Sequence, residues 1–147
     1  MKPETTRRLD QLFKSLPVLV GGAVSRGEID AAELRIGMRF DADYREFIER
    51  YGGGVVGSLP IFGLRRAEVM AEDTFGVVDV TARFRADGWR PTDEWVVISM
   101  DLAGNPIGLA EGGEVWISDH DSGATSMVAP TFEDFVRKLL AECQASK

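Results

Sequence analysis

The sequence predicts an α+β fold in which helices pack on an antiparallel sheet. Apolar residues in the first 51 positions recur at helical spacing, and residues 94–121 form short β-rich runs separated by glycine-containing turns. Helical spacing then returns after Pro130. With 147 residues, 44% of them hydrophobic and 28% charged, the chain is long enough for one ordinary core. We therefore expect a single domain over residues 1–147, in which the helix over 5–16 is either part of the core or an extension.

Three helices are expected in the first third of the chain. The first covers residues 5–16, with Thr5 or Thr6 as its cap and Pro17 as its stop. One face of this helix is apolar and comprises Leu9, Leu12, Phe13 and Leu16. The sequence "DAAE", residues 30–33, spaces an acid pair as in a capping box and predicts a short second helix that Gly37 ends.

The third helix begins at Asp41 as its cap and ends at Gly52. Its apolar face comprises Tyr44, Phe47, Ile48 and Tyr51. A short strand is expected over residues 58–63. The segment 74–88 is ambiguous, because its valines favour a strand while its apolar residues keep helical spacing; we prefer the helix.

The second half predicts an antiparallel meander and a closing helix. Residues 94–101, 105–111 and 114–121 are the expected strands. The last helix follows Pro130, with Thr131 and Asp134 as its capping pair. Its expected buried stripe comprises Phe132, Phe135, Val136, Leu139 and Leu140.

Gly52, Gly54 and Gly57 have the G-x-G-x-x-G spacing of a dinucleotide-binding loop. Such a loop needs a strand before the glycines and a helix after them, so that free N–H groups face the phosphates. Here the glycines follow a helix. We therefore interpret them as a helix stop and a turn into the first strand, and we expect no bound cofactor.

The charge of the chain is unevenly distributed. The net charge is −7, and residues 91–136 hold nine acids and no Lys or Arg, whereas acids and bases balance over residues 1–90. Such a field repels nucleic acid and anionic membranes and attracts a basic partner. The alternative is a solvated acidic surface that only aids solubility.

Location is constrained by two further features. The apolar run over residues 16–24 follows several basic residues, but Pro17 and the pair Gly21 and Gly22 interrupt it and it is too short to span a membrane. Cys143 is the single cysteine, so no disulfide can form within the chain. We expect a cytoplasmic protein.

The segment Asp119, His120 and Asp121 is the strongest chemical candidate. These side chains could hold a metal if the strand breaks here, which Ser122 and Gly123 would permit. The alternative is a turn whose acids bond to the backbone. His120 is the only histidine, and no serine nucleophile elbow is present, so we predict neither a catalytic residue nor a bound metal.

Trp116 alternates with Val115 and Ile117 and is expected on the opposite face of its strand. If that face is open, Trp116 and the acids near it form a recognition surface. If a helix covers the face, Trp116 belongs to the core. Both interpretations remain open at this stage.

Five segments resemble the SUKH superfamily in the order in which that family has them. "FDADYREFIERYGGG" is similar to its signature helix, "LPIFG" to the strand that follows, "DLAGNPIGL" to its hairpin, "VWISDHDSG" to its Asp-His-Asp segment and "TFEDFVRKLL" to its closing helix. The resemblance runs from about residue 29 to residue 140. Phe40 and Asp41 replace the usual Leu-Pro, and Asn105 stands where an Asp is common. The matched structural positions are Tyr44, Phe47, Tyr51, Gly52, Gly53, Gly104 and Gly123.

The resemblance implies an α+β domain that acts by binding proteins. Bacterial members are largely immunity proteins that neutralise toxins, often nucleases, and fungal relatives regulate cell-wall synthesis as interaction hubs. The leading hypothesis is therefore an immunity-type protein that occludes a basic toxin and has no nucleic-acid or membrane partner. The alternatives are a regulatory scaffold and a metal-dependent enzyme centred on residues 119–121. The expected contacts are Asp101, Glu111, Glu114, Asp119 and Asp121, with Trp116 as the anchor.

Overall fold

The computed structural model describes residues 1–145, in which five α-helices, two 3-10 helices and six strands alternate along the chain. In chain order these elements are α1 (Pro3–Ser15), η1 (Pro17–Leu19), α2 (Arg26–Ile36), α3 (Ala42–Tyr51), β1 (Gly54–Val56), β2 (Leu59–Ile61), α4 (Val77–Ala86), η2 (Arg90–Glu94), β3 (Trp95–Met100), β4 (Pro106–Ala110), β5 (Val115–Ser118), β6 (Thr125–Ala129) and α5 (Phe132–Ala145).

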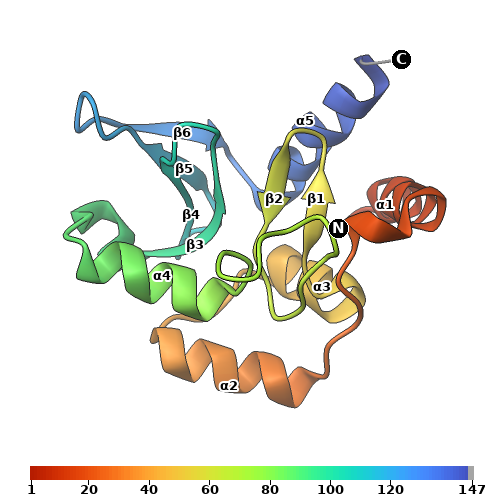
Figure 1. Cartoon of the computed structure of the whole chain (residues 1–147), viewed down its shortest axis with the longest axis horizontal. Helices are drawn as coiled ribbons and strands as arrows, with labels where there is room; N and C mark the ends of the chain where they lie inside the picture. The colour runs from red at the N-terminus through yellow and green to blue at the C-terminus, as the bar shows by residue number, and fades with distance from the viewer. Residues whose placement is uncertain (146–147) are drawn as a thin grey trace.

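The strands form two antiparallel sheets, which confirms the predicted α+β class. β1 and β2 make a hairpin, and the larger sheet has the order β3-β4-β5-β6. In Figure 1, α4 runs beside β3, while α1, α3 and α5 surround the β1–β2 hairpin. The hairpin also joins the larger sheet, because the N–H of Phe62 donates to the carbonyl of Ile98 over 2.7 Å. One face of the larger sheet is therefore turned toward the helices and the other away from them.

The core is one continuous cluster to which each of the five α-helices contributes. Its centre is aromatic: Phe47 lies 5.7 Å from Phe132 and 6.5 Å from Phe13, measured between ring centroids, in edge-to-face arrangements. Leu9 and Phe13 bring α1 into this cluster. All five residues of the stripe predicted on the last helix are buried.

Helix starts were predicted less well than helix ends. α1 begins at Pro3, without a side-chain cap, so Thr5 and Thr6 are not its caps. It ends at Ser15, and Leu16 lies beyond it, 49% exposed. α2 begins one turn before the predicted acid pair, because Ser25 and Glu28 form a complete capping box.

Other predicted boundaries are confirmed. Asp41 caps α3 through its side chain, and Thr131 accepts a hydrogen bond of 3.0 Å from the N–H of Asp134 at the start of α5. Gly37 and Gly52 end α2 and α3 in the left-handed conformation. The ambiguous segment 74–88 contains helix α4, as preferred.

Position 52 requires a glycine both because its backbone is left-handed and because a side chain there would collide with neighbouring atoms. Its φ is +74°, and a Cβ there would collide with the carbonyl oxygen of Gly22 and lie 2.8 Å from Cγ of Arg65. The apolar run over residues 16–24 explains this crowding, since it crosses the start of β1 with a bridge between Val20 and Gly54. The glycine motif is thus a helix stop packed against another segment of the chain.

Two strands were not predicted. β1 is only three residues long and includes a glycine, so its composition gave little β signal. β6 pairs with β5 through residues 125–129, and its first three residues are exposed. An edge strand with one weakly apolar face lacks the alternation that identifies inner strands. None of the helices in residues 1–145 has the length and apolar composition needed to cross a membrane.

Candidate protein-binding groove

The outer face of the larger sheet carries two tryptophans on neighbouring strands. Gly108 on β4 pairs with Trp116 on β5, which pairs in turn with Met127 on β6. Trp95 on β3 pairs with Ala110, two positions from Gly108 and so on the same face. Met127 is 53% exposed. The register therefore resolves the question left open by the sequence: the Trp116 face is not covered by a helix, and Trp116 lines a groove at the surface.

The indole of Trp95 packs directly against the backbone of Gly108. A Cβ on Gly108 would lie 2.6 Å from both Cβ and Cδ2 of Trp95 and would also collide with its Cε3. Only a glycine lets the indole lie flat on β4 in this way. Trp95 is 6% exposed as a result, although it belongs to the outer face.

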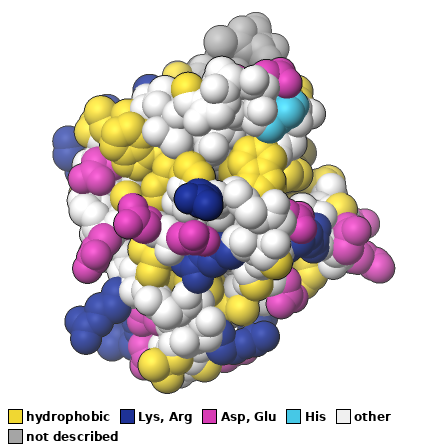
Figure 2. Space-filling view, turned by 90° about the vertical axis from the view of Figure 1, so that its left-hand side faces the viewer, with side chains coloured by type: hydrophobic (Ala, Val, Ile, Leu, Met, Phe, Trp, Pro, Cys, Tyr) yellow, Lys and Arg dark blue, Asp and Glu magenta, His cyan; other side chains and the backbone are white. Residues whose placement is uncertain are grey.

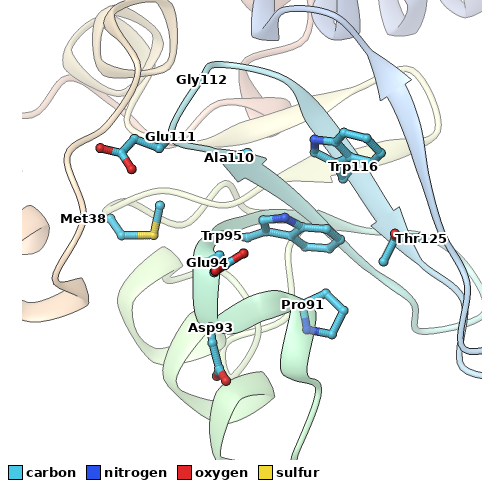
Figure 3. A pocket seen from close by; sticks show the side chains of 10 residues that line it. All are labelled: Met38, Pro91, Asp93, Glu94, Trp95, Ala110, Glu111, Gly112, Trp116 and Thr125. Atoms are coloured by element: carbon cyan, nitrogen blue, oxygen red, sulfur yellow. The ribbon is translucent and has the colours of Figure 1, made fainter.

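A groove of about 750 Å³ opens over these residues (Figure 3). Trp95 lies at its centre, with Trp116 and Thr125 on one side and Met38 and Glu111 on the other. Its walls come from the β4–β5 hairpin, η2, and the turn between α2 and α3. The lining residues are Met38, Pro91, Asp93, Glu94, Trp95, Ala110, Glu111, Gly112, Trp116 and Thr125.

The groove is apolar at its centre and acidic at its edge. Asp93, Glu94 and Glu111 are exposed, and the lining contains no Lys or Arg. Figure 2 shows this side of the molecule, on which hydrophobic side chains, acids and some Lys and Arg side chains are intermingled. No ion pair within residues 1–145 involves these three carboxylates. Their charge is therefore available to a partner.

Three acids of α2 are paired with arginines. Arg45 pairs with Asp30 over 2.7 Å and with Glu33 over 2.8 Å, and Arg65 pairs with Glu28 over 2.9 Å. These carboxylates are already neutralised by neighbouring arginines. These three acids are thus engaged within the chain, whereas Asp93, Glu94 and Glu111 have no such partner among the described residues.

Arg85 on α4 holds the walls of the groove together. Its guanidinium donates to the carbonyls of Ile36, Thr92 and Trp95 over 2.7, 2.9 and 3.0 Å, and it contacts the sulfur of Met38. These bonds join the end of α2, η2 and the start of β3. Arg85 thus positions the backbone of Trp95 without lining the groove itself.

The predicted contact residues divide between the two ends of the sheet. Trp116 and Glu111 line the groove, and Glu114 lies at its rim in the β4–β5 hairpin, where its carboxylate folds over Gly112. The other three, Asp101, Asp119 and Asp121, lie at the opposite end, in the β3–β4 and β5–β6 turns. The sequence placed both sets in one acidic segment, but β4 and β5 separate them.

Asp101 shapes the β3–β4 turn. Its Oδ1 accepts from the N–H groups of Ala103 and Asn105 over 3.0 and 2.9 Å, and its Oδ2 accepts from the Asn105 side chain. Burial raises the pKa of Asp101, but these hydrogen bonds and the electrostatic interaction with His120 outweigh burial and hold the pKa below its usual value. Both oxygens are therefore engaged within the chain.

The Asp-His-Asp segment forms a turn. β5 ends at Ser118, and Oδ1 of Asp119 accepts from the N–H of Asp121 over 2.8 Å, so the backbone-bonded alternative is the one observed for Asp119. The His120 ring lies 2.6 Å, Nδ1 to Oδ1, from Asn105 and packs edge-on against Trp89. Within residues 1–145 no group of three His, Cys, Asp or Glu side chains is arranged to hold a metal ion.

Two acids of the same segment lie elsewhere. Glu133 and Asp134 are in the first turn of α5, where Glu133 accepts a hydrogen bond of 2.7 Å from the N–H of Lys2. The nine acids of residues 91–136 thus do not form one patch. They divide among the groove, the opposite end of the sheet and the start of α5.

Sequence reasoning missed Trp95, Asp93, Glu94 and Met38 as site residues. Alternation along residues 94–101 could have placed Trp95 on one face, but its partner strand and register were unknown. Glycine in the middle of a β-rich run, as at Gly108, is the signal that a large side chain packs there. No local sequence pattern identifies Met38 as a site residue, because only the folding of the chain brings the turn between α2 and α3 against the sheet.

The chain is thus an α+β domain with an open groove on the outer face of its larger sheet. The chain belongs to the SMI1/KNR4 family (SUKH-1), whose profile matches residues 23–138. The match covers the segments in which the resemblance was found except for the last two residues of the closing helix segment, and α1 precedes it. No curated protein matches the chain.

Proposed function

We propose that this protein is an immunity-type binding domain that neutralises a basic toxin in the cytoplasm by occluding the toxin's active surface. Membership of the SMI1/KNR4 family supports a role in binding proteins. The observation that carries the proposal is the groove, in which two tryptophans are flanked by unpaired carboxylates. The protein would act by binding alone, with no catalytic step.

The chemistry of a nuclease explains why such a groove would inhibit it. A nuclease presents cationic side chains to the phosphates of its substrate, and carboxylates satisfy the same cations. Trp116 lines the groove together with Glu111, and its strand partner Met127 is 53% exposed, so both add apolar area to this surface. An aromatic anchor next to complementary charge is typical of the energetic centre of an interface.

The acids at the opposite end of the sheet have a different role in this proposal. Asp119 and Asp121 are exposed, so they add to the negative field that steers a basic partner toward the molecule. Asp101 contributes charge but engages both oxygens in its own turn. We therefore propose direct contact at Glu111, Glu114 and Trp116, and long-range attraction from the other three.

Affinity capture at low salt tests this function. The tagged protein is exposed to lysates of its source organism and of competing strains, and bound proteins are eluted with a salt gradient and identified by mass spectrometry. The proposal predicts one basic polypeptide, released at moderate salt, whose toxic activity is abolished by one equivalent of this protein. A captured polypeptide that remains fully active in the complex contradicts neutralisation. Several host proteins held through high salt would instead favour a regulatory scaffold.

A further inference from the structure

Trp95 carries an unused hydrogen-bond donor. The residue is 94% buried, yet no hydrogen bond within residues 1–145 uses its indole Nε1–H. No side-chain nitrogen or oxygen in that part of the chain is both sealed from solvent and without a partner. The Trp95 N–H is therefore accessible, and the space that reaches it is the groove that Trp95 lines. A ligand in the groove would find this donor at its centre.

The groove thus combines three kinds of contact. It offers a donor at Trp95, carboxylate acceptors at Glu94 and Glu111, and apolar surface at Trp116 and Met38. A small polyamine could satisfy the carboxylates but has no acceptor for the indole N–H. A polypeptide segment satisfies all three, since its carbonyls accept, its basic side chains are cationic and its apolar side chains fill the remaining space.

We propose that the groove binds an arginine-bearing segment of the partner protein, with the guanidinium against Glu94 and Glu111 and a neighbouring carbonyl accepting from Trp95. This inference rests on the proposed function and specifies the part of the basic partner that enters the site. Arginine fits better than lysine for two reasons. Its planar group bonds carboxylates in pairs, and it also stacks on indoles; Trp95, at the centre of the groove, is the indole that lies between Glu94 and Glu111 and the rest of the site.

Nuclear magnetic resonance tests the inference on the full chain. The probe is a blocked pentapeptide with arginine at its second and fourth positions and leucine between them. The three tryptophans give three indole N–H signals, and Trp89 lies outside the groove beside His120. Titration is expected to shift the signals of Trp95 and Trp116 in a saturable way and to leave that of Trp89 unchanged.

Two peptides and two variants separate this contact from general attraction to an acidic protein. A citrulline peptide has the shape of the arginine peptide without its charge, and a lysine peptide has the charge without the planar group. Glu94→Gln and Glu111→Gln should each weaken binding of the arginine peptide about fivefold. Glu68→Gln and Glu72→Gln remove the same charge from exposed positions outside the groove lining and should leave binding unchanged.

Several results would overturn the inference. They are equal binding of the arginine and citrulline peptides, equal binding of the lysine peptide, a shift at Trp89 alone, and equal weakening by the control variants. Failure of the proposed function looks different. If the peptide binds as expected but captured proteins remain active, the groove recognises arginine without neutralising a toxin. If a toxin is neutralised equally well by the Glu94→Gln and Glu111→Gln double variant, only the groove inference fails.

Discussion

Replacing Gly108 by alanine tests whether the packing of Trp95 on Gly108 maintains the groove. A new Cβ would lie 2.6 Å from Cβ and Cδ2 of Trp95, closer than Cβ atoms come to other heavy atoms in proteins, so the indole or the strand must move. Trp95 is held on its other side by the Arg85 bond to its carbonyl, and β4 is held by strands on both sides. Overpacking of this kind costs about 1–3 kcal/mol.

Urea denaturation followed by tryptophan fluorescence measures this cost. With a slope of about 2 kcal/mol per molar urea, a loss of about 2 kcal/mol lowers the midpoint by about 1 M. Movement of the indole should also change the emission spectrum of the native protein, because Trp95 would no longer be buried against β4. The arginine peptide should bind the variant more weakly for the same reason.

Gly112→Ala is the matched control on the same hairpin. Its new Cβ would meet only the carboxylate end of Glu114, with Cδ at 3.0 Å, and that flexible side chain can rotate away. Alanine also restricts the unfolded chain, so the variant should be as stable as the wild type or more stable by about 0.5 kcal/mol. A Gly108→Ala protein with an unchanged urea midpoint and unchanged emission would refute the claim that Trp95 needs a glycine at position 108. Equal losses in both variants would point to the strands and not to Trp95.

Three further variants test other parts of the account. Arg85→Met removes three hydrogen bonds to carbonyls and should lower the free energy of unfolding, measured by urea denaturation, by about 2–3 kcal/mol. The control Arg83→Met loses one exposed hydrogen bond and should change the free energy of unfolding by less than about 0.5 kcal/mol. Equal effects of the two substitutions would contradict the role of Arg85. Tyr44→Phe leaves the carbonyl of Phe62 without its 2.6 Å bond inside the core and should cost about 1–2 kcal/mol by the same measurement; an unchanged midpoint would show that the bond contributes nothing. The folded pKa of Asp101 lies below its ordinary value of 3.8, so its stabilisation is present above pH 3.8 and is lost as pH falls through the folded pKa. The stability difference between the wild type and Asp101→Asn should therefore shrink in acid, and a difference that grows in acid would reverse the assigned direction.

The elements with strong periodicity could be predicted from the sequence. α3 and α5 each carry a polar cap and an apolar stripe, and both lie where expected. β6 and the start of α2 were missed for local reasons. β6 is a mostly exposed edge strand and so lacks a clear alternation. For α2, two capping patterns lie one turn apart, and the capping box that forms is that of Ser25 and Glu28, not the acid pair of residues 30–33.

The candidate site was predicted only in part, because strand register decides it. Trp116, Glu111 and Glu114 could be selected from composition and alternation within one strand. The pairing of Gly108 with Trp116 and the position of Trp95 depend on contacts between strands, which no local pattern specifies. For the same reason one acidic segment could not be divided in advance into separate surfaces.

The association rate of the captured toxin tests the central claim most directly. Stopped-flow measurements at low and high salt would compare the wild type with the Glu94→Gln and Glu111→Gln double variant and with the Glu68→Gln and Glu72→Gln control, which has the same net charge. Electrostatic capture at the groove predicts slower association of the groove variant at low salt, and rates that converge as salt screens the field. Unchanged association of the groove variant at low salt would contradict the claim that this groove is where the partner binds.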